Sequence, residues 1–309
     1  MRHILRKVNR KKSKIFLKRA GLGNLATELC SKISLFDIGA SYFFAANWTK
    51  LLQYKPSEIF LVDPNENTLD YLSNLPKNLN INRISSAISR TGGKQVFYKT
   101  NVISGSSLLE PDLDLILSNK TPAKIKDYFL PIEEILIDTI STSELLNKSL
   151  AKSKFLKIDI QGYELELLKG ASEFLENGNL ILIELETSTL SHRYMKNSSS
   201  LKEIVGFMES FGYNVLEIVP IYSEFADSAG RSHKSYLNEC DIAFIADANN
   251  VKFRNSQSLE AIFLAYLVYG FTGMALSMLE NDHDLINDFE SRGINLDKLK
   301  EFIAKDNFL

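Results

Sequence analysis

The sequence predicts an α/β fold in which a doubly wound, mostly parallel sheet carries a C-terminal helical appendage. From about residue 33 to residue 247, short apolar runs alternate with amphipathic stretches of helical spacing. Such alternation is typical of parallel strands joined by crossover helices and covered on both faces. After Asn249 the strand-like runs stop and the spacing becomes helical. The 309 residues, of which 45% are hydrophobic and 24% charged, are enough for one large core with an appendage.

Seven short apolar runs are interpreted as strands. They are Ile33 to Ile38, Glu58 to Val62, Ile84 to Ile88, Phe155 to Ile160, Asn179 to Leu185, Tyr213 to Val219 and Cys240 to Ala246. The last two are expected to close the sheet as an antiparallel pair. The predicted helices are Ala45 to Tyr54, a helix opening at Thr68 to Leu72, Tyr163 to Leu175 and Leu201 to Ser210. The third of these helices has apolar residues at 167, 168, 171, 174 and 175, which lie on one helical face.

The C-terminal part contains an uncharged run from Ala261 to Leu279, and its nineteen residues reach the length of a membrane span. Gly270 and Gly273 interrupt the run, so we expect two short helices packed as a hairpin on the domain or on a second subunit of a homo-oligomer. An amphipathic helix broken near Gly293 should follow. The expected division is a basic extension at residues 1–30, an α/β domain at 31–248 and a helical extension at 249–309.

The N-terminal segment is strongly basic, with nine of the 36 lysines and arginines lying between Arg2 and Arg19. The rest of the chain holds 27 basic and all 38 acidic residues, a net charge of −11. This acidic body argues against a nucleic-acid partner. Two interpretations of the basic segment remain open: peripheral contact with an anionic membrane, or a solvated helix that contacts nothing. Cys30 and Cys240 fit a reducing compartment and no cleaved signal peptide is expected, so we predict a cytoplasmic protein, membrane-peripheral if the first interpretation holds.

Acidic residues lie at the ends of four predicted strands. They are Asp37, Asp63, Asp159 and the pair Glu184 and Glu186. Ligands of parallel sheets bind at the carboxyl ends of strands, so we expect these carboxylates to share one crevice, although each could instead cap the following helix. The sequence Asp37-Ile-Gly39 would let a ligand approach the backbone, and Asp63 stands where a carboxylate reaches a ribose. These positions suit a nucleoside cofactor, and the absence of a G-x-G-x-x-G loop weakens the case for a nicotinamide.

The segment from Phe155 to Ala171, FLKIDIQGYELELLKGA, resembles the signature of the FkbM methyltransferase family. In that signature a strand ending K-I-D is followed by Q-G-x-E and a helix ending L-K-G-A. Other pieces occur in the family order: LFDIGA at 35–40, VDPN at 62–65, SAIS at 86–89, SGSSL at 104–108, IELE at 183–186 and DIAF at 241–244. The resemblance covers roughly residues 33 to 247.

This resemblance implies a seven-stranded class I methyltransferase sheet, S-adenosylmethionine as the methyl donor and O-methylation of a sugar, glycan or polyketide hydroxyl. It also implies roles for individual residues: Asp37 and Gly39 at the cofactor loop, Asp63 at the ribose, Ser86 and Ala87 near the adenine, and Asp159 near the transferring methyl group. An alcohol acceptor requires a general base. Asp159 is the first candidate, followed by Glu186 and by His192, whose other interpretation is a surface loop residue. No cluster with metal-ligand spacing is found, so no metal is predicted.

The sequence departs from the family pattern at two places. Tyr42 and Phe43 stand where the first loop of the family has a second glycine, and Ser143 replaces the first acid of its T-L-D-D-L element. Bulk in the first loop could crowd the cofactor or stack on it. The alternative to a methyltransferase is therefore a non-catalytic protein of the same fold that binds a glycan or a protein partner.

Overall fold

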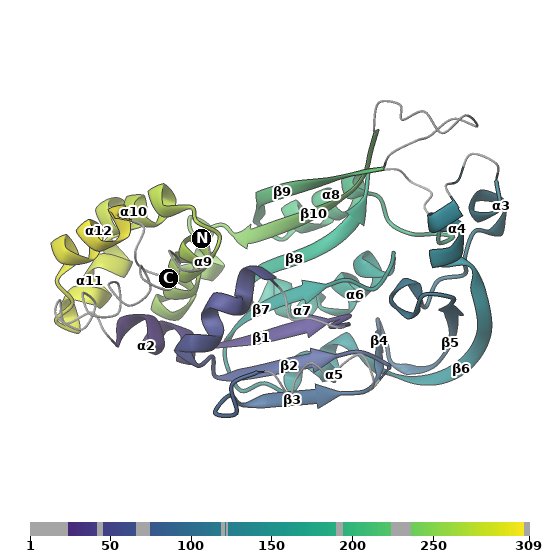
Figure 1. Cartoon of the computed structure of the whole chain (residues 1–309). Helices are drawn as coiled ribbons and strands as arrows, with labels where there is room; N and C mark the ends of the chain where they lie inside the picture. The colour runs from purple at the N-terminus through teal and green to yellow at the C-terminus, as the bar shows by residue number, and fades with distance from the viewer. Residues whose placement is uncertain are drawn as a thin grey trace, which may run out of the picture.

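The computed structural model describes residues 24–41, 46–65, 75–118, 121, 123–189, 194–223 and 236–305. The basic segment before residue 24, the pair Tyr42 and Phe43, and the helix expected at Thr68 lie outside these residues. The chain forms an α/β structure around a seven-stranded sheet of order β3-β2-β1-β7-β8-β10-β9 (Figure 1). The strands are β1 (Ile33–Ile38), β2 (Glu58–Val62), β3 (Ile81–Ile84), β7 (Ser153–Ile158), β8 (Leu180–Ser188), β9 (Tyr213–Ser223) and β10 (Tyr236–Ala246).

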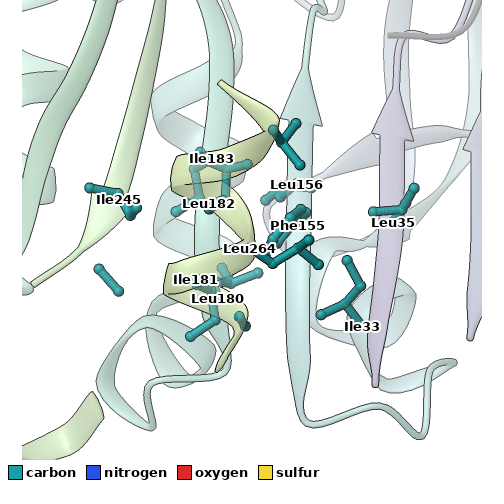
Figure 2. Close-up of a cluster of buried hydrophobic side chains, with 14 of the residues drawn as sticks. Ile33, Leu35, Phe155, Leu156, Leu180, Ile181, Leu182, Ile183, Ile245 and Leu264 are labelled. Atoms are coloured by element: carbon teal, nitrogen blue, oxygen red, sulfur yellow. The ribbon is translucent and has the colours of Figure 1, made fainter. Parts of the chain in front are cut away.

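The first five of these strands are parallel, and β9 and β10 are antiparallel, which confirms the mostly parallel sheet and its closing pair. All six side chains of β1 are buried, as expected for a central strand of a mostly parallel sheet. Helix α9 (Ser256–Val268) lies across β7 and β8, where Leu264 lies beside Phe155 (Figure 2). The hydrophobic core therefore runs through the centre of this sheet.

Two predicted elements are wrong in detail. The apolar run Ile84 to Ile88 is not one strand: Ile84 ends β3 in the large sheet, and Ala87 opens β4 (Ala87–Ser89) in another sheet. The helix expected from Tyr163 to Leu175 is divided at Ala171 into α6 (Glu164–Gly170) and α7 (Ser172–Glu176). By contrast, α8 (Leu201–Ser210) has the predicted bounds, and a Ser200–Glu203 capping box fixes its start.

A second, three-stranded sheet of order β4-β6-β5 was not predicted. Strand β5 spans Gly93–Thr100 and β6 spans Pro131–Ser141. Figure 1 shows this sheet beyond the carboxyl ends of β1, β2 and β3, with two short helices, α3 (Leu113–Ile116) and α4 (Ala123–Phe129), near it. The remaining short elements between residues 46 and 253 are η1 (Ala46–Tyr54), η3 (Ile103–Gly105), α5 (Thr142–Asn147) and η4 (Val251–Phe253).

The C-terminal residues form four helices: α9, α10 (Thr272–Asn281), α11 (His283–Ser291) and α12 (Leu296–Ala304). The uncharged run is divided between α9 and α10 near Gly270, whose φ of 80° favours glycine, so the expected pair of helices is confirmed. Among the residues that the structure describes, no helix is long and apolar enough to cross a membrane. The expected break near Gly293 also lies between two helices, α11 and α12.

Buried ion pairs attach the C-terminal helices to the start of the domain. Glu260 of α9 is only 3% exposed and accepts from Lys32 Nζ at 2.7 Å and from Arg292, the residue that follows α11. Lys32 follows α2 (Leu25–Ser31), and Arg292 also contacts Glu28 of that helix at 3.0 Å. Because a buried carboxylate without these partners would be strongly destabilising, the contacts fix α9 and α11 against α2. Within the chain, the C-terminal helices thus pack on the α/β domain.

Candidate functional site

A cavity of about 760 Å³ opens where the parallel strands end, between the large sheet and the small one. Six of the residues predicted from the sequence line it: Gly39, Asp63, Ser86, Ala87, Asp159 and Glu186. Asp37 lies just beneath the cavity within β1, and His192 lies outside the described residues. The structure thus places the carboxyl ends of β1, β2, β7 and β8 around one space, while the roles of the individual residues stay predictions.

Gly39 occupies the tightest point of this arrangement. Its φ of 81° is in the left-handed region, and its N–H donates to the Val62 carbonyl at 2.9 Å. A Cβ built on Gly39 would lie 1.8 Å from the carbonyl oxygen of Asp159. The loops that follow β1 and β7 can therefore approach each other only because residue 39 has no side chain.

Asp63 ends β2 at the rim of the cavity and is 6% exposed. One of its carboxylate oxygens accepts from Ser41 Oγ at 2.6 Å, and the other accepts from the backbone N–H of Asn65 at 2.9 Å. A carboxylate offers about four acceptor positions, so two remain for a ligand. These contacts hold Asp63 in one orientation with acceptor capacity left over.

Lys157 joins the two central carboxylates. Its Nζ lies 3.7 Å from Asp37 Oδ1 and 3.4 Å from Asp159 Oδ2, and Gln161 Nε2 donates to the other oxygen of Asp159 at 3.1 Å. Burial alone would lower the pKa of Lys157, but the negative charges of Asp159, Asp37 and Glu184 outweigh it and raise the pKa above its usual value. Lys157 therefore stays charged. The structure therefore shows Lys157 paired with neighbouring carboxylates, and Lys157 also lines the cavity.

The loop after β7 is held by Glu164. This side chain is 2% exposed and accepts from the backbone N–H groups of Ile160 at 3.2 Å and Gly162 at 3.0 Å. Between these residues Gln161 has a φ of 57°, an uncommon conformation for a residue with a side chain. Burial raises the pKa of Glu164 to about 7, and the backbone hydrogen bonds only partly oppose that rise. Glu164 therefore secures the conformation that presents Asp159 and Gln161 to the cavity.

The far wall of the cavity is mainly apolar. Its side chains come from the small sheet and α4 and include Phe97, Ile125, Tyr128, Phe129, Ile135 and Ile137. The Tyr128 hydroxyl lies 2.7 Å from Ser104 Oγ. Burial raises the pKa of Tyr128, and the charges of Asp159, Glu186 and Glu239 raise it further. This wall and Glu239, which also lines the cavity, were not predicted from the sequence. The apolar run from Ile135 to Ile137 was a signal that could have indicated a strand here.

The expectation that Glu184 shares the crevice is wrong. Glu184 is not among the residues that line the cavity; it accepts from the Tyr269 hydroxyl and from Asn47 Nδ2, the latter at 3.2 Å. The physical reason is its place in β8, two residues before Glu186 and beside η1 and the end of α9. Ser143, the second departure from the family pattern, lies in α5 and likewise does not line the cavity. In the described part of the chain, no group of three or more His, Cys, Asp or Glu could hold a metal ion.

A sequence model of the FkbM methyltransferase domain matches residues 37–215, more than half of the chain. The chain belongs to the FkbM methyltransferase family. The match spans the first loop, the Lys157–Asp159 segment and β8, and it ends within β9. Comparison with curated protein sequences gives no significant match.

Three solved structures show weak similarity to this FkbM-family chain. A precorrin-6y C5,15-methyltransferase from Geobacter metallireducens is 14% identical, with 74% of this chain and 88% of that chain covered and a TM-score of 0.32. A putative RNA methyltransferase from Pyrococcus horikoshii is 9% identical, with coverages of 72% and 85% and a TM-score of 0.31. A SAM-dependent methyltransferase from Anabaena variabilis is 9% identical, with coverages of 75% and 85% and a TM-score of 0.33. At these values the family assignment rests on the sequence match.

FkbM membership implies S-adenosylmethionine as the methyl donor, and the residues present fit it. Because Gly39 has no side chain, a ligand at the end of β1 would meet only backbone atoms at this position. Asp63 keeps acceptor positions that would suit ribose hydroxyls, and Ser86 and Ala87 line the same cavity. The volume of the cavity is in the range of known cofactor pockets.

Proposed function

We propose that this protein transfers a methyl group from S-adenosylmethionine to a hydroxyl of a sugar, glycan or similar metabolite. The observation that carries the proposal is that one cavity of about 760 Å³ contains both Gly39 and Asp63, which suit a nucleoside, and Asp159 and Glu186, which suit a proton acceptor. A cofactor and an acceptor could then be held side by side, and such juxtaposition supplies much of the rate enhancement of group transfer.

When bound, S-adenosylmethionine supplies a methyl group already activated by the sulfonium, so the protein must align the acceptor oxygen and take its proton. In our proposal the carboxylate of Asp159 would accept that proton while the methyl group passes from sulfur to the acceptor oxygen, which would leave the sulfur as a neutral thioether. Lys157 and Gln161 each contact one oxygen of Asp159, and these two contacts fix the orientation of the carboxylate. Glu186, at the same cavity, is the alternative base.

A hydroxylated acceptor with apolar faces suits the far wall. Tyr128 and Ser104 present hydroxyls there, and Phe97 and Phe129 present ring surfaces. Sugars and polyketides both combine hydroxyls with exposed C–H groups, which pack on aromatic rings. This mixture supports the substrate class without selecting one member of it.

Calorimetric titration of the full chain with S-adenosylmethionine, and with its demethylated product S-adenosylhomocysteine, tests the proposal. We expect both to bind to one site per chain. A panel of sugar and polyketide alcohols, assayed with radiolabelled donor, then identifies the acceptor. Absence of binding by either adenosyl compound would contradict the proposal.

Such a negative result would favour the second candidate function, a non-catalytic protein that binds a glycan or a protein partner. The bulk of Tyr42 and Phe43 in the first loop is the observation in its favour. Binding of the cofactor by the wild-type chain would contradict this second candidate.

A further inference from the structure

The end of α9 contacts strand β8 next to the candidate site through Tyr269. The helix begins beside the amino end of β7, where Ser153 Oγ donates to the Gln257 carbonyl at 3.5 Å, and it runs towards the carboxyl ends of the strands. Tyr269 caps it, and the Tyr269 hydroxyl donates to Glu184 of β8. The match to the family ends at residue 215, so this tyrosine belongs to a part of the chain outside the family domain.

The same contact includes the first helical turns after the Gly39 loop. Asn47 of η1 donates to Glu184 through Nδ2 at 3.2 Å, and Trp48 Nε1 donates to the Tyr269 hydroxyl at 3.4 Å. Trp48 is completely buried. The phenol of Tyr269 is thus both donor to Glu184 and acceptor from Trp48, and it links α9, β8 and η1 at one point.

Glu184 also stands next to the central lysine of the site. In the register of the sheet, Asp37 pairs with Lys157 and Lys157 pairs with Glu184. Register partners in parallel strands point to the same face, so the three side chains form a row across β1, β7 and β8. Yet the ammonium of Lys157 contacts Asp37 and Asp159, while Glu184 accepts from Tyr269 and Asn47.

We propose that Tyr269 is a positioning residue for the cofactor site. By holding Glu184 against η1, it keeps that carboxylate from drawing Lys157 away from Asp159, and it fixes the helix that follows the first cofactor loop. Burial of Tyr269, together with the negative charge of Glu184, raises the pKa of the phenol, so it remains a neutral donor. The C-terminal helices are then part of the methyltransferase site. This inference rests on the proposed function.

The test is a set of calorimetric affinities for S-adenosylmethionine in the full chain. Tyr269→Phe, which keeps the ring and loses the hydroxyl, should weaken binding about fivefold to tenfold, the effect of losing one ordinary hydrogen bond. Tyr266→Phe is the matched control, because Tyr266 lies one turn earlier in α9 and is away from Glu184; its affinity should stay within about twofold of wild type.

A double variant distinguishes an effect of Tyr269 that acts through Glu184 from a simple loss of packing. In the double variant Tyr269→Phe with Glu184→Gln, no carboxylate remains to compete for Lys157, so affinity should recover to that of Glu184→Gln alone. Additive losses in the double variant would overturn the proposal, as would unchanged affinity in Tyr269→Phe. If Tyr269→Phe does not fold, the exposed Asn47→Ala removes the other donor to Glu184 and must weaken binding in its place; unchanged affinity there overturns the inference.

The outcomes also separate this inference from the proposed function. Failure of wild type to bind S-adenosylmethionine overturns the proposed function and this inference with it. Binding by wild type that Tyr269→Phe leaves unchanged overturns only the role of Tyr269.

Discussion

Gly39 and Asp159 lie in such close contact that a single methyl group on Gly39 would overlap the backbone of Asp159. A Cβ on Gly39 would be 1.8 Å from the Asp159 carbonyl oxygen and 2.8 Å from its carbonyl carbon. The Asp159 N–H in turn donates to the Ile38 carbonyl at 2.9 Å. The end of β1 and the end of β7 are therefore held together, and the position of Asp159 depends on the loop at Gly39.

We predict that Gly39→Ala destabilises the protein by about 2–4 kcal/mol, because it adds a clash with backbone to an unfavourable φ. Urea unfolding followed by circular dichroism measures this. Gly93→Ala is the matched control: Gly93 has a similar φ of 86°, but a Cβ there meets nothing within 4 Å. The control should lose only about 1 kcal/mol, the contribution of the backbone conformation. Equal losses in the two variants would show that the contact with Asp159 is unimportant.

Asp63→Ala should weaken binding of S-adenosylmethionine by roughly 1–3 kcal/mol, the range for hydrogen bonds to a charged group. The expectation follows from the two acceptor positions that Ser41 and Asn65 leave open on this carboxylate. Calorimetry on the folded variant gives the value. The exposed Asp114→Ala, on the surface of α3, controls for a general change of charge. Unchanged affinity in Asp63→Ala would remove the ribose assignment.

The fold was predictable where local signals were unambiguous. Strand β2 has the predicted bounds because the apolar run Glu58 to Val62 is preceded by Pro56 and followed by Asp63-Pro64. The run Ile84 to Ile88 (ISSAI) contains the ends of two strands in different sheets, and periodicity cannot show where a chain leaves one sheet for another. The small sheet was missed for the same reason.

The candidate site was predictable in so far as it follows strand ends. Asp63 and Asp159 share a cavity because parallel strands bring their carboxyl ends to one edge. Tyr269 and Glu184 are 85 residues apart, and nothing in either local sequence indicates their contact. It depends on where α9 crosses the sheet, which tertiary packing decides. The apolar wall around Tyr128 depends on the fold of the small sheet in the same way.

Two substitutions distinguish the candidate bases once an acceptor is known. If Asp159 takes the proton, Asp159→Asn should lower kcat about 100-fold or more with the fold retained, whereas Glu186→Gln should lower it less than tenfold. Both changes preserve side-chain volume, so the thermal unfolding temperature serves as the check on folding. The reverse order of the two kcat values would assign the base to Glu186. Wild-type turnover in both variants would mean that neither carboxylate is the base.

Removal of residues 1–19 tests the membrane interpretation of the basic segment. Nine lysines and arginines are lost, and we expect binding to phosphatidylserine-containing vesicles to fall while thermal stability stays nearly unchanged. Sedimentation with vesicles measures binding, and neutral phosphatidylcholine vesicles are the control for non-electrostatic adsorption. Equal binding of the full and shortened chains to the anionic vesicles would favour the solvated segment.

The free energy of unfolding should fall as the pH rises from about 4.5 to 7, because Glu164 titrates in this range in the folded protein. Burial raises its pKa in the folded protein to about 7, against 4.5 for an ordinary glutamate, so in this range the folded chain holds a proton that the unfolded chain has released. The stabilisation is complete below pH 4.5, declines up to pH 7 and is constant above it.

Glu164→Gln cannot titrate, and its amide oxygen can still accept from Ile160 and Gly162. The free energy of unfolding of wild type minus that of the variant should therefore decrease by on the order of 3 kcal/mol across this interval. Urea unfolding at several pH values measures the difference. Glu173→Gln, on the exposed surface of α7, is the matched control and should show little change in that difference. A difference for Glu164→Gln that does not vary with pH would mean that Glu164 is ionised throughout, and that its hydrogen bonds to the loop outweigh its burial.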